Sequence, residues 1–120
     1  MEEFREGAIL LTVLRNRGRV QEEVQGKILG QWGVHASDKF GVRFQITEMT
    51  TGFYVHGDMS EADALALAKR FYALGPVMVS VSDKGKTVFE DGEQRKALVE
   101  IMKQFDKERR GSEVIEDEDE

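Results

Sequence analysis

The sequence contains no cysteine, so the chain can form no disulfide, no thiolate metal site and no thiol nucleophile. It also contains no long hydrophobic run. The apolar stretch at residues 8–14 is far shorter than the ~18 residues that a membrane-spanning helix requires. The missing thiols agree with a reducing compartment, and we therefore expect a cytoplasmic protein.

Signatures of catalysis are equally scarce. The serines occur in no nucleophile-elbow pattern, and no glycine-rich loop ends in the Gly-Lys-Ser/Thr of a phosphate-binding loop. The only two histidines are His35 and His56. His56 and Asp58 could form a general base with an orienting carboxylate or supply two metal ligands, but a Gly-Asp pair is also typical of a turn. We lean away from an enzyme and expect no catalytic residues, no metal and no cofactor.

The negative charge is concentrated at the C-terminus. Six of the 23 acidic residues lie within residues 113–120, which leaves 17 to balance the 17 lysines and arginines of the rest. A run of like charges repels itself and cannot bury apolar surface. We therefore expect one globular domain over residues 1–111 and a disordered acidic tail over residues 112–120. The balanced domain argues against strong non-specific nucleic-acid binding, which usually needs a basic surface.

Alternation and capping signals predict the elements of the C-terminal two thirds. Residues 42–48 and 53–56 alternate like the strands of a hairpin around a glycine turn. A serine cap and apolar helical spacing predict a helix over residues 60–75, which Gly-Pro ends. A second hairpin is expected over residues 77–89. A final helix should run from Asp91 to Gly111.

The N-terminal third is harder to interpret. Val20, Val24, Ile28 and Trp32 recur every four residues, which indicates a helix over residues 20–32. We favour a strand over residues 8–14. The chain then reads as an α+β, ferredoxin-like β-α-β-β-α-β sandwich with an added short C-terminal strand and helix. A helix at residues 2–16 would instead give a winged-helix-like arrangement, which is the alternative.

In the ferredoxin-like arrangement, two helices cover one face of an antiparallel sheet and leave the other face open. The residues expected on the open face are Arg43, Gln45, Thr47, Tyr54, His56, Met78 and Ser80. Tyr54 with Arg43 could stack RNA bases there, as aromatic and basic side chains do on RNA-recognition sheets. The sequence pattern of those modules is absent, however.

The strongest basic feature is the loop of Arg15, Arg17 and Arg19, which we expect just before a helix whose N–H groups could join in holding an anion. Lys27 would lie one or two turns further along that helix. The loop could bind a phosphate, an RNA backbone or an acidic protein segment. The plainer reading is a solvated loop next to a helix end.

The tail carries one aliphatic pair, Val114 and Ile115, followed by Glu116 and Asp117. Such a segment could dock on a partner, or it could serve only as a solubilising end. We predict a non-enzymatic regulatory or adaptor protein that acts by protein-protein binding. The alternative is an RNA/DNA-binding protein that uses the Arg15–Arg19 loop and the Tyr54 sheet face, gated by the tail. The exposed sheet edges could also support a homo-oligomer.

Overall fold

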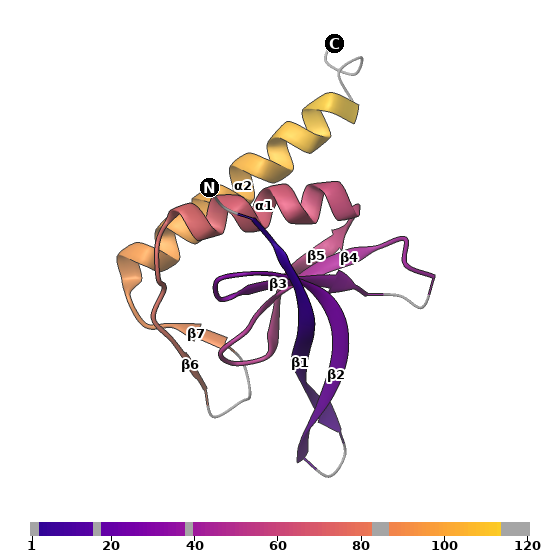
Figure 1. The fold of residues 1–120 in the computed structure, drawn as a ribbon. Coiled ribbons are helices and arrows are strands. Elements are labelled where there is room, and N and C mark those ends of the chain that lie inside the picture. The colour runs from indigo at the N-terminus through magenta and orange to yellow at the C-terminus, as the bar shows by residue number, and fades with distance from the viewer. Residues whose placement is uncertain (1–2, 16–17, 38–39, 83–86, 114–120) are drawn as a thin grey trace.

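The computed structural model describes residues 3–15, 18–37, 40–82 and 87–113 of the 120-residue chain. The elements are β1 (Arg5–Arg15), β2 (Gly18–Leu29), β3 (Trp32–Ala36), β4 (Phe44–Glu48), β5 (Phe53–Met59), α1 (Glu61–Ala73), β6 (Val79–Val81), β7 (Thr87–Phe89) and α2 (Gly92–Glu113). Strands β1 to β5 form one antiparallel sheet, and β6 and β7 form a second, two-stranded sheet (Figure 1). The fold class is therefore α+β.

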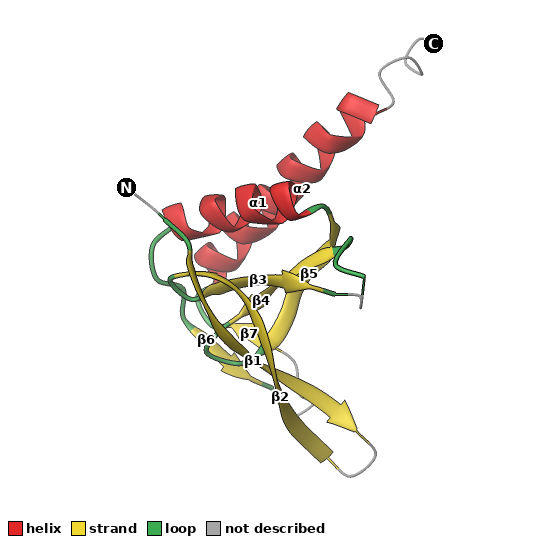
Figure 2. Cartoon of the chain, turned by 45° about the vertical axis from the view of Figure 1, so that its right-hand side comes forward, coloured by secondary structure: helices red, strands yellow, loops and turns green. Residues whose placement is uncertain are grey.

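The five-stranded sheet is a meander in which each strand pairs with the next one along the chain. Both helices lie on one side of it (Figure 2). The sheet curls so far that β1 reaches the turn between β4 and β5. There the backbone N–H of Thr12 donates to the Gly52 carbonyl oxygen at 2.8 Å, and the Thr12 hydroxyl donates to the Thr51 carbonyl oxygen at 2.8 Å. The first and last strands of the sheet are thus brought together at one point.

The predicted helix over residues 20–32 is wrong, because these residues form β2, a tight turn and the start of β3. The four-residue spacing of Val20, Val24 and Ile28 places them on one face of a helix, but it also places them on one face of a strand, whose period is two. With strands in place of this helix, the ferredoxin-like order is not formed. The preferred strand over residues 8–14 is confirmed as part of β1, and the winged-helix-like alternative is not formed either.

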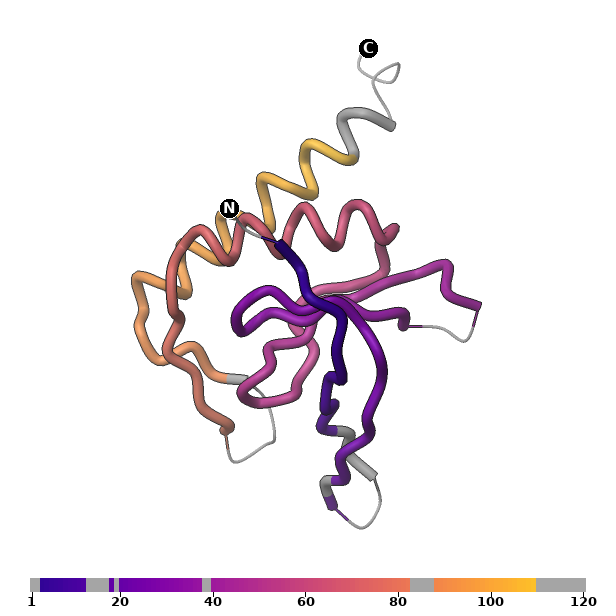
Figure 3. The backbone as a smooth tube through the Cα atoms, viewed as in Figure 1, coloured from indigo at the N-terminus to yellow at the C-terminus, as the bar shows by residue number. Residues whose placement is uncertain are grey.

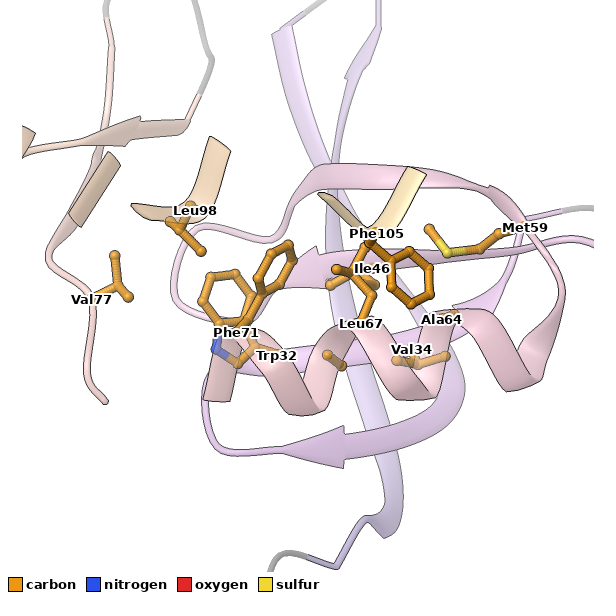
Figure 4. Packing of buried hydrophobic residues seen from close by; sticks show 11 residues of the cluster. Trp32, Val34, Ile46, Met59, Ala64, Leu67, Phe71, Val77, Leu98 and Phe105 are labelled. Carbon is orange, nitrogen blue, oxygen red and sulfur yellow. The ribbon is translucent and has the colours of Figure 1, made fainter. Parts of the chain in front are cut away.

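The main core lies between the sheet and the two helices (Figure 4). Trp32 of β3 packs against Phe71 of α1 with ring centroids 4.9 Å apart. Leu98 and Phe105 of α2 join the same cluster of buried side chains. Burial of each such side chain stabilises the fold by about 1.5–3 kcal/mol. This cluster determines where the helices sit on the sheet.

Both helices begin at the caps that the sequence predicts. The Ser60 hydroxyl accepts from the backbone N–H of Asp63 at 3.1 Å, and an Asp91 carboxylate oxygen accepts from that of Glu93 at 2.9 Å. Helix α2 runs to Glu113, two residues beyond the expected end. The remaining residues, 114–120, lie outside the described residues. Neither of the two described helices is both long and apolar enough to cross a membrane.

Candidate functional site

The most unusual feature of the molecule is the length of β1 and β2, with 11 and 12 residues. They pair with each other from Arg5 and Ile28 to Arg15 and Gly18. In contrast, β2 pairs with β3 only over Lys27–Leu29. The remainder of the two strands is a ribbon that runs away from the helices (Figures 1 and 3). We call this part, residues 8–15 and 18–25, the β1–β2 ribbon.

The β1–β2 ribbon leaves the sheet at Gly26. A Cβ atom at this position would lie 2.4 Å from the Val34 carbonyl oxygen and 2.7 Å from Cδ1 of Ile9. Neither neighbour can move easily, because one is backbone of β3 and the other is a fully buried side chain. Gly7 stands opposite Gly26 in the strand pair. The backbone of β2 can therefore pass this close to β3 only because glycine occupies the position.

Aliphatic side chains continue from the core onto the β1–β2 ribbon. Ile9 is completely buried, but its neighbour Leu10 is 48% exposed and Val20 on the other strand is 43% exposed. Leu10 lies opposite Glu23 in the register, so an apolar and a polar side chain sit side by side on that face, whereas Val20 lies on the other face. The β1–β2 ribbon thus has accessible aliphatic side chains with polar side chains beside them.

The register also determines which backbone groups of β2 point away from β1. In an antiparallel pair, alternate residues direct their N–H and C=O groups towards the partner and away from it. The N–H of Thr12 points away from β2, because it donates to Gly52, and Thr12 lies opposite Gln21. Gln21 therefore directs its N–H and C=O outwards, and so do the residues two positions away. The backbone groups of Arg19, Gln21, Glu23 and Gln25 form what we call the outer edge of β2.

Within the described part of the chain, no backbone hydrogen bond joins the outer edge of β2 to another segment. The other end of β2 agrees with this assignment. Lys27 and Leu29, which follow Gln25 at intervals of two residues, lie on the same edge and pair with β3 there. The outer edge is thus a row of hydrogen-bonding groups that continues directly from the edge that β3 occupies. Its length and accessibility make it the clearest candidate for a binding surface in this molecule.

The arginine-rich segment lies at the end of the β1–β2 ribbon rather than before a helix, which corrects the prediction. Arg15 ends β1 and Arg19 is the second residue of β2, whereas Arg17 lies outside the described residues. Lys27 is at the other end of β2, where its ammonium group pairs with Glu61 of α1 at 3.1 Å. The structure therefore separates Lys27 from the arginines.

Arg43 is also separated from that end. Arg43 precedes β4, whereas the contact between β1 and the β4–β5 turn lies beyond the opposite end of β4. Its guanidinium pairs with Asp58 at 2.6 Å on the exposed surface. Tyr54 is 59% exposed on β5, so it is available for contacts. Of the six predicted anion-binding residues, Lys27 and Arg43 thus each form an ion pair with a different carboxylate, Glu61 and Asp58.

The β4–β5 pairing has two irregularities. The first explains why His56 does not share a face with Tyr54, as the predicted open face required. The register shifts between Ile46 and Thr47, so Ile46 lies opposite His56 but Thr47 lies opposite Tyr54. His56 and Tyr54 consequently lie on opposite faces. His56 faces the helices, where its Nε2 is 3.3 Å from the Asp106 carboxylate of α2.

The second register shift accounts for Asp58. It falls between Phe44 and Gln45 and leaves Asp58 out of the pairing, with a positive φ of 64°. Asp58 then turns to Arg43, whereas His56 turns to Asp106. The structure therefore does not bring the His56–Asp58 pair together. Among the described residues, no group of three or more histidine, aspartate or glutamate side chains is arranged to hold a metal ion.

The face opposite the helices is covered by the curled sheet itself. Thr47 is fully buried there, and Ile9 and Met49 close over Gly33. His35 lies on this face, with its Nε2 2.8 Å from the Thr47 hydroxyl and its Nδ1 donating to the Ala36 carbonyl oxygen at 3.0 Å in the tautomer that both contacts favour. Burial lowers the pKa of His35, against a smaller opposite effect of the Ala36 hydrogen bond.

A polar network that the sequence did not reveal ties the β2–β3 turn to the segment after α1. Gln31 accepts from the backbone N–H of Val77 at 2.8 Å and donates to the fully buried carboxylate of Glu48 at 2.8 Å. Glu48 also accepts from the backbone N–H of Thr51 at 2.7 Å. The side chains of Gln31 and Glu48 thus bond to other groups of the same chain, so we interpret the network as structural. Only the order of the strands brings these residues together, so no local signal could have indicated it.

A cleft of about 480 Å³ lies beside this network. It is lined by Gly30, Gln31, Trp32, Tyr72, Ala73, Gly75 and Pro76. The Tyr72 ring covers the backbone of Gly30, where a Cβ atom would come within 2.7 Å of it. The described residues that line the cleft include no charged side chain, and the amide of Gln31 is already used by Val77 and Glu48.

Comparisons with protein-family models, with curated proteins and with solved structures returned no match.

Proposed function

We propose that this chain is a non-enzymatic, protein-binding adaptor or regulatory protein whose binding surface is the β1–β2 ribbon. The supporting observation is the outer edge of β2, a row of outward-directed backbone groups beside the 43% exposed side chain of Val20. A strand from a partner could add to this edge, gaining affinity from backbone hydrogen bonds and selectivity from contacts with the side chains of β2, Val20 among them.

The construction of the edge supports this function over a purely structural one. Exposed edges invite pairing with other chains, and stable proteins commonly shorten them, bend them or interrupt them with proline. Here the strand is long and proline-free, since the one proline of the chain is Pro76. Glu23 supplies a charge that discourages indiscriminate pairing, so the edge should accept a partner of complementary charge.

The proposal can be tested by blocking one backbone position. Because the N–H of Gln21 points away from β1, Gln21→Pro leaves the β1–β2 ladder intact but removes a donor from the outer edge of β2 and fills the space a partner strand would need. We expect immobilised wild-type protein to retain a specific partner from an extract of the source cells, and Gln21→Pro to lose it. Gln21→Ala keeps the N–H and should retain the partner. If all three proteins retain the same set, the ribbon is not the binding surface.

A second candidate function is nucleic-acid binding by the end of the ribbon. It is favoured by the position of Arg15 and Arg19 on either side of the connection between β1 and β2, since two-stranded ribbons with basic residues can enter a DNA groove. Glu22 and Glu23 nearby reduce the positive potential of that surface. The acidic residues 113–120 could compete with a nucleic acid for the same arginines.

Salt dependence distinguishes this second candidate from the first. Binding of a labelled oligonucleotide should weaken steeply with salt if arginines contact phosphates. Deletion of residues 114–120 should strengthen it. An absence of binding at low salt, for the full-length and the truncated protein alike, would remove this candidate and leave the protein-binding proposal unaffected.

A further inference from the structure

We propose that the strand added to the outer edge of β2 is the same edge of a second copy of this chain. The two strands would run antiparallel about a two-fold axis at Gln21 and form a continuous four-stranded sheet in the order β1, β2, β2 of the partner, β1 of the partner. This inference rests on the proposed function, because it names the partner of the ribbon.

The alternation of backbone groups restricts how two copies can pair. Outward-directed groups occur at Arg19, Gln21, Glu23 and Gln25, so these positions must face one another across the interface. A symmetric antiparallel pair then has its axis at a residue, not between two residues. The axis can therefore lie at one of the positions 19 to 23. The charges of the paired residues and the position of β3 decide between these positions.

Charge removes three of these five positions. With the axis at residue 19, Arg19 of one copy would lie directly opposite Arg19 of the other. Axes at residues 22 and 23 would place two Glu22 or two Glu23 residues opposite each other in the same way. Like charges directly opposite each other destabilise a strand pair. An axis at residue 22 would also bring the end of the second ribbon to Lys27, where β3 already occupies the edge. Axes at residues 20 and 21 remain.

An axis at Gln21 is favoured over one at Val20 by both charge and length. It places Arg19 of each copy directly opposite Glu23 of the other, giving two pairs of opposite charge, and it sets residues 18–24 of the two copies side by side. An axis at Val20 places Arg19 opposite Gln21 and overlaps only residues 18–22. The longer overlap still ends before Lys27, so β3 does not interfere.

Pairing would also remedy a weakness of the isolated ribbon. A two-stranded ribbon alone is marginally stable in water, whereas three or more strands with an apolar face are stable. The axis at Gln21 would add about six backbone hydrogen bonds and place Val20 of one copy beside β2 of the other.

The absence of cysteine provides a direct test of this pairing, because a single introduced cysteine can form a disulfide only between two copies. At the proposed axis the two Gln21 Cα atoms would be about 5.5 Å apart, which suits a disulfide. Under mild oxidation we expect Gln21→Cys to migrate mainly as a covalent dimer that a reductant converts to monomer. Gln25→Cys is the matched control, since it is exposed on the same edge but would lie roughly 27 Å from its own copy.

Two results of this experiment would overturn the pairing. Gln21→Cys could remain monomeric at high protein concentration, or both variants could cross-link equally, which would indicate random collisions. Charge variants provide a second measurement by sedimentation. Arg19→Glu and Glu23→Arg should each raise the dimer dissociation constant at least tenfold, and the double variant should restore it. Identical dissociation for all four proteins would contradict the proposed register.

The failure of self-pairing can be distinguished from the failure of protein binding as a whole. If the wild-type chain sediments as a monomer but Gln21→Pro still abolishes the capture of another protein, the second-copy proposal is wrong and the binding function stands. If the wild type is monomeric and capture is insensitive to Gln21→Pro, both are wrong.

Discussion

The helix-covered side of the sheet and the β1–β2 ribbon are built on opposite principles, although β1 and β2 contribute to both. On the helix-covered side, Trp32 and Phe71 are enclosed by side chains from the sheet and both helices. In the ribbon, the two strands pair with each other, β1 meets the β4–β5 turn at Thr12, and Leu10 and Val20 remain accessible. The difference indicates that the helix-covered side contributes most of the free energy of unfolding, whereas the β1–β2 ribbon has side chains accessible to a partner. The following predictions test this division.

The largest effect is expected in the enclosed region. Phe71→Ala removes a fully buried ring that packs against Trp32, and it should lower the free energy of unfolding by about 3–5 kcal/mol. Urea unfolding followed by tryptophan fluorescence measures this directly, since Trp32 is the only tryptophan. Tyr54→Ala removes a similar ring from an exposed position and should cost less than about 1 kcal/mol. Equal losses for the two variants would contradict the division.

The junction between the two regions should show an intermediate effect. Gly26→Ala places a methyl group against the Val34 carbonyl oxygen and Ile9, so we expect a loss of about 1–3 kcal/mol in the free energy of unfolding. Gly92→Ala is a suitable control, because a Cβ at Gly92 meets no atom within 4 Å. Should Gly26→Ala be as stable as Gly92→Ala, the close passage of β2 over β3 is not present in solution.

A smaller, pH-dependent effect is expected from His35, which is buried between the two regions. Its folded-state pKa lies below the usual value of 6.5, so at lower pH the unfolded chain binds a proton more readily than the folded one. Its contribution is therefore fully present above pH 6.5 and decreases as the pH falls from there towards the lowered value. The slope for one proton is at most about 1.4 kcal/mol per pH unit.

The measurement compares wild type with His35→Gln by urea unfolding at about pH 7.5 and about pH 5.5. The wild type should lose more stability than the variant over this interval, because only the wild type must protonate this side chain on unfolding. If the two proteins lose the same amount, His35 is accessible to solvent and the curled sheet does not cover it.

The smallest change in stability is expected in the ribbon. Leu10→Ala removes a half-exposed side chain and should alter the free energy of unfolding by no more than about 0.5 kcal/mol, whereas Ile9→Ala, one residue earlier, should cost about 2–5 kcal/mol. Urea unfolding measures both changes. A large stability loss for Leu10→Ala would mean that the ribbon is part of the core.

Much of the fold could be predicted from local signals. The caps at Ser60 and Asp91 fixed the starts of both helices, and alternation identified β4, β5, β6 and β7. Residues 20–32 could not be assigned correctly, because the four-residue spacing satisfies the periods of both a helix and a strand. The ferredoxin-like arrangement depended on that one helix, so a single ambiguous spacing changed the topology.

The candidate site was less predictable, since it depends on register. The sequence indicated the cluster of Arg15, Arg17 and Arg19 but gave no means of knowing that β2 continues past β3. One extra residue in the β4–β5 pairing moved His56 to the helices and left Tyr54 on the other face. Which backbone groups of β2 point outwards follows only from the pairing of Thr12 with Gln21.

The most direct test of the account is residue-resolved amide hydrogen exchange along β2 in dilute protein. We predict that the N–H groups of Gln21 and Glu23 exchange quickly, whereas those of Glu22 and Val24, which face β1, are protected. Raising the protein concentration should then protect Gln21 and Glu23. Strong protection of Gln21 and Glu23 in dilute, monomeric protein would contradict the account, because it would mean that the chain itself covers the outer edge of β2.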